Sequence, residues 1–413
     1  MNTFFKGIII AFMVFTAQFA CADEGLNTEQ NHDPLTSVVE GNTRFAIDMY
    51  KVLASEGDGN LFFAPYSVSS AMAMTAAGAV GDTEKEIFDA LRLPSYSEDL
   101  HTCFSELVNI LHRPSSSKVV SANALWSQEG MHILPSFVET TQQYYRAHVD
   151  TLDFIRNKKY AVATINGWVA ENTNDKILDI LTEQDVSDST RLVLVNALYF
   201  KGSWQHPFRA ENTIEDPFYV STEVTTMAEM MNQTTKIPYH KGEGYSVVAL
   251  PYQEESSEIP GYAMVIIVPD DYNGITAVEE NLDIETVMND YASLEPTKVQ
   301  LSMPKFSMRK KVLLNEVLQQ MGMVTPFTGD ADFSDINGFG DLSISKVIHE
   351  TFIDVDEEGT EAAAATAVTM NLTSVYSPEP AVVVRADHPF MAFIVDQATG
   401  SILFMGKVVN PKE

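Results

Sequence analysis

The chain has 413 residues, of which 45% are hydrophobic, and 57 acidic against 26 basic side chains give it a formal net charge of −31. This apolar content is enough for a large core and excludes a disordered chain, while the negative charge disfavours binding to nucleic acid or to an anionic membrane. With only two cysteines, a disulfide-dense scaffold is also excluded.

Residues 1–22 have the pattern of a secretory signal. Lys6 supplies a positive charge, residues 7–19 form an apolar stretch, and Ala20-Cys21-Ala22 is a small-residue cleavage site. The stretch is shorter than the about 20 apolar residues of a membrane span. We therefore predict a secreted protein, extracellular or periplasmic. Lipid anchoring at Cys21 is an alternative that the preceding residues fit less well.

Hydrophobic periodicity predicts a mixture of helices and strands along the rest of the chain. Helical spacing predicts helices over residues 43–53, 67–79, 82–91, 166–181 and 313–321. Apolar or alternating runs predict strands over residues 121–126, 192–200, 247–250, 263–268 and 298–303.

This order of elements favours an α+β fold over a doubly wound one, because strands and helices do not alternate strictly. No linker-like stretch divides the chain, so we predict one domain over residues 38–411 after a flexible segment, residues 23–37. Cys103 lies in a helix-like setting and is predicted to be a buried, inert thiol.

Sequence motifs of several common catalytic sites are absent. There is no G-x-S-x-G, no phosphate-binding loop, no H-E-x-x-H and no C-x-x-C. The acidic cluster over residues 354–358 has consecutive charges, which are more typical of a solvated turn than of a cation site. We therefore predict a protein that is not an enzyme and uses neither a metal nor a cofactor.

The most unusual segment is residues 357–370, Glu-Glu-Gly-Thr-Glu followed by four alanines and Thr-Ala-Val-Thr-Met. Four consecutive alanines favour a helix, yet the segment also alternates like a strand. One face carries no charge and runs from Thr360 to Met370, and the other holds Glu361 and Asn371. A segment compatible with loop, helix and strand is what a change of state requires.

This segment resembles the reactive-loop hinge of the serpins, the serine protease inhibitors that act by loop insertion. Further motifs of that family follow in order along the chain. They are Asn60-Leu-Phe-Phe-Ala-Pro-Tyr-Ser67, Leu194-Val-Asn196-Ala-Leu-Tyr-Phe-Lys-Gly202-Ser-Trp204, Met303-Pro-Lys305-Phe306, Ala331-Asp-Phe-Ser334, His388-Pro-Phe390 and Leu403-Phe-Met-Gly-Lys-Val408.

The resemblance implies a metastable serpin fold with three β-sheets, about nine helices and an exposed reactive loop over about residues 357–381. It implies a monomer whose partner is a target serine protease, trapped as a covalent acyl-enzyme when the cut loop inserts into the large sheet. The absence of a basic cluster gives no reason to expect activation by heparin.

The resemblance also assigns residues within the loop. The hinge comprises Glu357, Gly359, Thr360, Glu361, Ala362, Ala363, Ala364, Ala365 and Thr366. Small, uncharged residues on the inward face of this hinge favour rapid insertion and therefore an inhibitory member. By the family's usual spacing the cut bond is Thr373–Ser374, with Leu372 and Tyr376 as alternative bait residues.

Thr373 suits elastase-like or subtilisin-like proteases, and Leu372 or Tyr376 a chymotrypsin-like one. No Arg or Lys lies between Gly359 and Ala381, which disfavours trypsin-like targets. Two other functions stay open: a non-inhibitory serpin that acts as a binding or chaperone protein, and an inhibitor of papain-like cysteine proteases.

Five residues outside the loop match positions of the family that control opening of the sheet. They are Ser67, Asn196 and His349 in a buried polar cluster, and Lys305 and Trp204 near the entry of the loop. The resemblance implies an ion pair between Lys305 and Glu357. Two positions depart from the pattern: Ala64 replaces the usual Ser, and Glu350 a common Lys.

Overall fold

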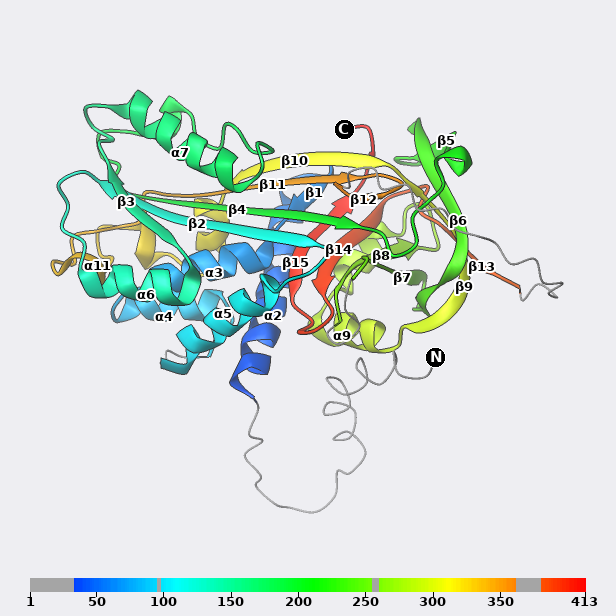
Figure 1. Cartoon of the computed structure of the whole chain (residues 1–413), viewed down its shortest axis with the longest axis horizontal. Coiled ribbons are helices and arrows are strands. Elements are labelled where there is room, and N and C mark those ends of the chain that lie inside the picture. The colour runs from blue at the N-terminus through cyan, green and yellow to red at the C-terminus, as the bar shows by residue number, and fades with distance from the viewer. Residues whose placement is uncertain (1–32, 95–97, 255–259, 362–379) are drawn as a thin grey trace, which may run out of the picture.

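The computed structural model describes residues 33–94, 98–254, 260–361 and 380–413. Long strands run across the molecule and form one sheet, and a second, more steeply oriented sheet lies beside it (Figure 1). Helices cover both faces of the first sheet. This arrangement confirms the predicted α+β class.

The first sheet has six strands in the order β10-β11-β12-β4-β2-β3. Their bounds are β2 Lys118–Gln128, β3 His148–Leu152, β4 Leu192–Ser203, β10 Phe306–Leu313, β11 Lys346–Val355 and β12 Gly359–Thr360. Strand β4 has nine buried residues in its first nine positions, because helices cover both faces of the sheet. Strands β4 and β11 run parallel and are paired directly only from Lys346↔Val193 to Thr351↔Leu198.

The second sheet has nine strands in the order β1-β15-β14-β8-β7-β6-β9-β13, with β5 paired to β6. Their bounds are β1 Leu61–Phe63, β5 Ile214–Tyr219, β6 Thr225–Lys241, β7 Tyr245–Pro251, β8 Tyr262–Pro269, β9 Glu295–Pro304, β13 Val382–Arg385, β14 Phe390–Asp396 and β15 Ile402–Val408. The 17-residue β6 pairs with β5, β9 and β7 along its length. Hydrogen bonds through β6 therefore join two of the three expected sheets into one.

Ten α-helices belong to the described residues: α2 Pro34–Ser55, α3 Pro65–Ala76, α4 Asp82–Ala90, α5 Glu98–Leu111, α6 Pro135–Tyr145, α7 Lys158–Asn172, α8 Ile275–Glu280, α9 Ile284–Ala292, α10 Asn315–Gln320 and α11 Ser334–Asn337. Helix α3 is buried on all sides between β2, β4 and β15. Helix α7 packs on the opposite face of the first sheet (Figure 1). No helix in this part of the chain is long and apolar enough to cross a membrane.

The predicted helix over residues 166–181 is wrong in its second half. Helix α7 begins earlier, at Lys158, and ends at Asn172, and the chain then turns through Asn174 and Asp175, which have φ of 49° and 59°. Two consecutive left-handed residues cannot continue a right-handed helix. The segment that follows α7 therefore forms a loop next to the first sheet.

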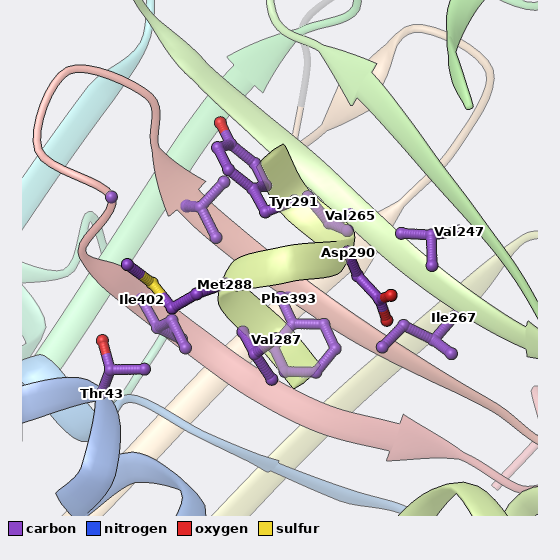
Figure 2. A pocket seen from close by; sticks show the side chains of 12 residues that line it. Thr43, Val247, Val265, Ile267, Val287, Met288, Asp290, Tyr291, Phe393 and Ile402 are labelled. Carbon is purple, nitrogen blue, oxygen red and sulfur yellow. The ribbon is translucent and has the colours of Figure 1, made fainter. Parts of the chain in front are cut away.

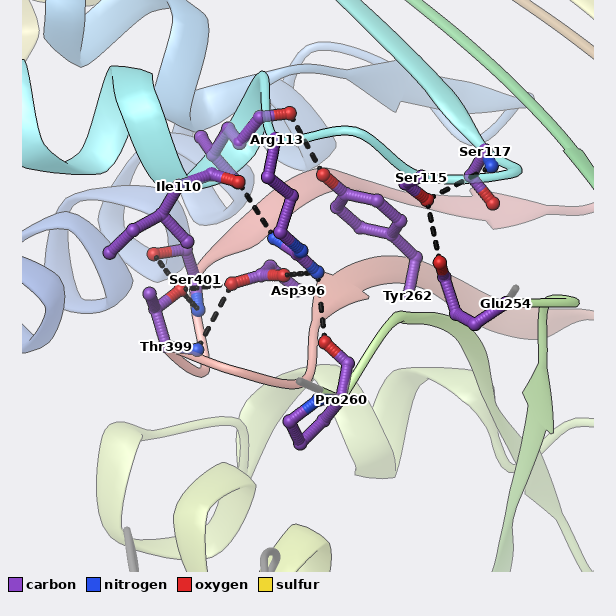
Figure 3. A network of polar contacts seen from close by, with 11 residues as sticks. Ile110, Arg113, Ser115, Ser117, Glu254, Pro260, Tyr262, Asp396, Thr399 and Ser401 are labelled. Atoms are coloured by element: carbon purple, nitrogen blue, oxygen red, sulfur yellow. Dashed lines mark hydrogen bonds and ion pairs between the residues drawn. The ribbon is translucent and has the colours of Figure 1, made fainter. Parts of the chain in front are cut away.

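A buried ion pair ties the end of α5 to the second sheet (Figure 3). Arg113 Nη2 donates to Asp396 Oδ1 at 2.7 Å and to the Pro260 carbonyl at 2.9 Å. The other carboxylate oxygen accepts from the backbone and hydroxyl of Thr399 at 3.0 and 2.7 Å. Burial raises the pKa of Asp396, against the effect of Arg113. The free energy of this network therefore depends on every partner being in place.

We expect Asp396→Asn to lower the unfolding midpoint in urea, because loss of one partner of a buried ion pair costs about 3–5 kcal/mol. The matched control is Asp89→Asn, which removes the partner of Lys85 in a pair with both side chains more than half exposed. That variant should unfold like the wild type. Equal midpoints for the two variants would contradict the assigned importance of the Arg113–Asp396 pair.

Candidate functional site

The predicted hinge begins as a tight hairpin at the end of β11. Strand β11 ends at Val355, and β12 returns antiparallel to it with Thr360 opposite Val355. The Asp356 amide donates to the Gly359 carbonyl at 3.0 Å, and the Asp356 carboxylate accepts from the Glu358 amide at 2.8 Å. The hinge therefore enters the sheet through an ordered turn.

Strand β12 lies between the C-terminal ends of β11 and β4. Its other neighbour is β4, with Gly359 opposite Ser203 and Thr360 opposite Gly202. A Cβ atom at position 359 would collide with the Gly202 carbonyl oxygen, and one at position 202 would lie 2.8 Å from Tyr252 Cδ1. Glycine at position 359 therefore allows the close approach of the two backbones, and glycine at position 202 leaves room for the packed side chains of Tyr252, Ser117 and Phe200.

Thr360 is the first hinge residue whose side chain is buried in the sheet. It is 1% exposed, and its hydroxyl shares a 2.6 Å hydrogen bond with Tyr252. The Tyr252 ring stacks on Trp204 with centroids 4.7 Å apart. Burial raises the pKa of Tyr252, so this hydroxyl stays protonated. Thr360 thus has a polar partner at a site where a larger or charged side chain has no room.

The ion pair between Lys305 and Glu357 is present beside the hairpin, with Lys305 Nζ 3.3 Å from Glu357 Oε2. Thr213 donates to the other oxygen at 2.8 Å. Burial opposes ionisation, but these bonds hold the pKa of Glu357 below its usual value. Trp204 lies nearby, and its Nε1 donates to the Asp356 carbonyl at 2.9 Å. All four predicted residues at the loop entry, Trp204, Lys305, Glu357 and Gly359, therefore lie together.

A second polar cluster joins β4 to β11 in the stretch where the two strands pair directly. Asn196 Nδ2 lies 2.6 Å from the Ser67 hydroxyl and 2.6 Å from Asn123 Oδ1. Asn196 Oδ1 lies 2.7 Å from His349 Nδ1, across the β4–β11 pair. The structure brings together all three predicted residues and adds Asn123 from β2.

The protonation state of His349 follows from its two partners. The Ala64 amide donates to Nε2 at 3.0 Å, so Nε2 is an acceptor and the ring proton lies on Nδ1, where it donates to Asn196. Complete burial lowers the pKa of His349 to about 4. The imidazole is therefore neutral at pH 7, and its single proton links the two strands.

The two departures from the family pattern have different consequences. Ala64 contributes its backbone amide to His349, so the cluster forms without a side chain at that position. Glu350 is 3% exposed and lies 3.9 Å from Arg309 Nε. Burial raises the pKa of Glu350, although Arg309 opposes this effect.

Most of the predicted reactive loop lies outside the described residues. Glu361 is the last described residue before the gap, and the hinge residues Ala362, Ala363, Ala364, Ala365 and Thr366 fall within it. So do the predicted bait residues Leu372, Thr373, Ser374 and Tyr376.

Sequence reasoning missed Asn123, Tyr252 and Lys176, although each contacts a predicted residue. Lys176 Nζ lies 3.1 Å from Glu361 Oε1. An ordinary asparagine, tyrosine and lysine carry no motif, and their partners lie 73 to 185 residues away along the chain. Their places follow only from the packed sheet.

An apolar pocket lies away from the hinge, between α9 and strands of the second sheet (Figure 2). Its space of about 50 Å³ is far below the about 300–1,000 Å³ of small-molecule sites. Asp290 at its rim already accepts from the Tyr245 hydroxyl at 2.7 Å. In the described part of the chain, no group of three or more His, Cys, Asp or Glu residues converges as a metal site.

Comparison with known proteins identifies the family. The family model described as "Serpin (serine protease inhibitor)" matches residues 40–411, and the chain therefore belongs to the serpin family. The leukocyte elastase inhibitor of Bos taurus is 37% identical over 382 residues, which cover 90% of this chain and 98% of that protein. An uncharacterized serpin-like protein of Thermococcus kodakarensis is also 37% identical, over 91% of this chain and 86% of its own.

Solved structures agree with this assignment. Human glycosylated kallistatin matches with a TM-score of 0.81 at 30% identity, over 92% of this chain and 99% of that one. The predicted serpin fold is confirmed. Members of the family are generally protease inhibitors rather than enzymes.

The comparisons contradict the predicted localisation. The leukocyte elastase inhibitors of Bos taurus and Homo sapiens are serpins that lack signal peptides. The prediction of an extracellular or periplasmic protein, with lipid anchoring at Cys21 as its alternative, is therefore wrong. Residues 1–22 lie outside the described residues. A short apolar run before small residues was an insufficient signal for this assignment.

We expect His349 to make the stability of the protein depend on pH. Its pKa is about 4 in the native state and about 6.5 when unfolded, so the unfolded state takes up the proton first. The resulting stability is complete above pH of about 6.5 and is lost as the pH falls towards about 4, by about 3 kcal/mol in total.

Urea unfolding midpoints measured across this pH range test the assignment. The midpoint of His349→Gln should fall less steeply with acidity than that of the wild type, because glutamine does not titrate. His132→Gln, at an exposed position, should retain the wild-type slope. Parallel curves for all three proteins would contradict a buried, neutral His349.

Proposed function

We propose that the protein is a suicide inhibitor of serine endopeptidases that acts by covalent trapping and loop insertion. The observation that carries this proposal is the position of Gly359 and Thr360, which already pair as a strand between β4 and β11. Because these two residues already form a strand, insertion requires only that the strand be extended beyond Thr360. Kinetically, insertion has to be faster than hydrolysis of the acyl-enzyme.

The side chains of the hinge support insertion of the following residues. Thr360 faces the side of the sheet that carries Tyr252, so strand alternation would bring Ala362, Ala364 and Thr366 to the same side after insertion. These side chains are small and uncharged, and burying them costs little. The lower part of the β4–β11 pair is joined by Asn196 and His349, whose bond has to open as the strand advances.

The chemical steps belong to the attacking protease. Its serine hydroxyl attacks the carbonyl carbon of Thr373, the Thr373–Ser374 bond breaks, and the amine of Ser374 leaves with the proton. The acyl-enzyme ester then links the protease to Thr373. Insertion of residues 361–373 carries the protease along the sheet and deforms its oxyanion hole, so that water no longer completes the hydrolysis.

The target class follows from the residues near the cut bond. Thr373 fits the small specificity pockets of elastase-like and subtilisin-like enzymes, and Leu372 and Tyr376 fit a chymotrypsin-like pocket. The similarity to leukocyte elastase inhibitors supports an elastase-like target. We further propose that the inhibitor acts as a monomer, as a single serpin domain over about residues 38–411, and without heparin.

Incubation with elastase, subtilisin, chymotrypsin and papain, followed by denaturing gel electrophoresis, tests the proposal. A band at the summed mass of the inhibitor and a serine protease is expected, because an acyl ester survives denaturation. The released C-terminal peptide, identified by mass spectrometry, should begin at Ser374. Clean cleavage without an adduct would refute inhibition and favour a binding or chaperone role, and an adduct with papain alone would favour a cysteine protease target.

A second test changes the residue that enters the sheet first. Thr360→Arg should convert the inhibitor into a substrate, because an arginine cannot occupy the buried position beside Tyr252. Thr360→Ser keeps the hydroxyl and should inhibit like the wild type. The measurement is the stoichiometry of inhibition, and an unchanged value for Thr360→Arg would contradict the insertion mechanism.

A further inference from the structure

The hinge leaves the sheet at Glu361, and the backbone there is strained. The Glu361 amide still donates to the Asp354 carbonyl at 2.8 Å, so the hairpin extends one hydrogen bond past β12. Its φ of 51° lies in the left-handed region, which is unfavourable for a residue other than glycine. This conformation turns the chain out of the sheet directly after Thr360.

The carboxylate of Glu361 is held by Lys176 from the loop after α7. The Lys176 ammonium lies 3.1 Å from Glu361 Oε1, and the glutamate side chain is only 12% exposed. The same carboxylate lies close to Tyr199 of β4, whose pKa is raised to about 12 by burial first and then by Glu361. The charge of Glu361 is therefore enclosed between the loop and the sheet.

Lys176 is itself fixed by the edge of the sheet. Its backbone carbonyl accepts a hydrogen bond from Arg309 of β10. The Lys176 ammonium and the Arg309 guanidinium both lie over the Phe352 ring of β11, 5.3 and 5.8 Å from its centroid. Lys176 thus reaches Glu361 from a position that is fastened to β10 and β11.

We propose that Lys176 and Glu361 are positioning residues that hold the intact hinge inserted by two residues, so that insertion starts from a seated strand. This inference rests on the proposed inhibitory function for its kinetic consequence, but not for its structural one. Without the ammonium, an enclosed carboxylate would lack a counter-charge. The hinge would then leave the sheet, and the carboxylate would return to water.

The strained backbone at Glu361 favours movement of the hinge further into the sheet. During insertion Glu361 becomes the next strand residue, and its φ changes from the left-handed to the extended region. In a strand its side chain points away from Thr360, to the other face of the sheet. That face is covered by α7 and the loop that carries Lys176. Insertion therefore relieves backbone strain and leaves the carboxylate on the side of its partner.

Hydrogen–deuterium exchange of the intact, uncleaved protein tests the seated hinge without any protease. In Lys176→Gln, peptides that contain the amides of Thr360 and Glu361 should exchange at least about fivefold faster than in the wild type. Lys176→Arg should restore protection, because it keeps the charge. The control is Lys159→Gln, an exposed lysine on α7, which should exchange like the wild type.

A double-mutant cycle separates the charge pair from other effects of the lysine. Glu361→Gln breaks the same pair, so its hinge should also exchange faster than that of the wild type, and adding Lys176→Gln should change nothing further. The inference is overturned if Lys176→Gln exchanges like the wild type. It is equally overturned if the effect of Lys176→Gln persists in the Glu361→Gln background.

The kinetic consequence is measured with a protease that forms an adduct with the wild type. Lys176→Gln should raise the stoichiometry of inhibition at least about twofold, because slower insertion lets more acyl-enzyme hydrolyse, and the association rate should not change. If no protease forms an adduct but the exchange results hold, the proposed function fails and the positioning pair stands. If adducts form but exchange is unaffected, the positioning pair fails and the proposed function stands.

Discussion

The divided contact between β4 and β11 is the constraint on which the rest of the structure depends. The two strands pair directly from Lys346 to Thr351, and above that point β12 separates them. Where they pair directly, the parallel backbone pairing is supplemented by one side-chain hydrogen bond, from Nδ1 of His349 to the buried amide of Asn196. The sheet forms without an added strand, yet few side chains join β4 to β11 along the seam between them. The proposed insertion would therefore start at the end where β12 already separates β4 from β11 and would not require the domain to unfold.

The contacts around this seam fall into two groups. Arg309 and Glu350 lie on β10 and β11, which are paired over eight residues and would move as one unit, so opening the seam leaves their contact intact. Asp185, in the loop after α7, approaches Lys311 and Lys346 at 3.3 and 3.4 Å. Burial opposes its ionisation, but bonds from Thr182 and these lysines lower the pKa of Asp185 to about 2. The loop after α7 is thus fastened electrostatically to the same two strands.

The fold was largely predictable because its central strands are unusually apolar. The run over residues 192–200 is buried on both faces and appears as part of β4, and the predicted strand over residues 263–268 appears within β8. Strand β10 escaped prediction since it is an edge strand with Arg309, Lys310 and Lys311 in sequence, a pattern that protects an edge from pairing rather than one that marks a core. The end of α7 depended on left-handed residues that no periodicity reveals.

The candidate site was predictable only where a motif carried it. Ser67, Asn196 and His349 could be named from the resemblance, but their hydrogen bonds and the acceptor role of Nε2 required the fold.

The hinge shows the limit most clearly. Alternation placed Thr360 on an inward face, yet it could not show that the residue is already buried while the backbone leaves the sheet at Glu361. That outcome depends on Gly202 and Gly359 approaching closely and on a lysine 185 residues away. The sequence of the hinge determines which residues can enter the sheet, whereas the tertiary contacts determine how far the intact chain has entered.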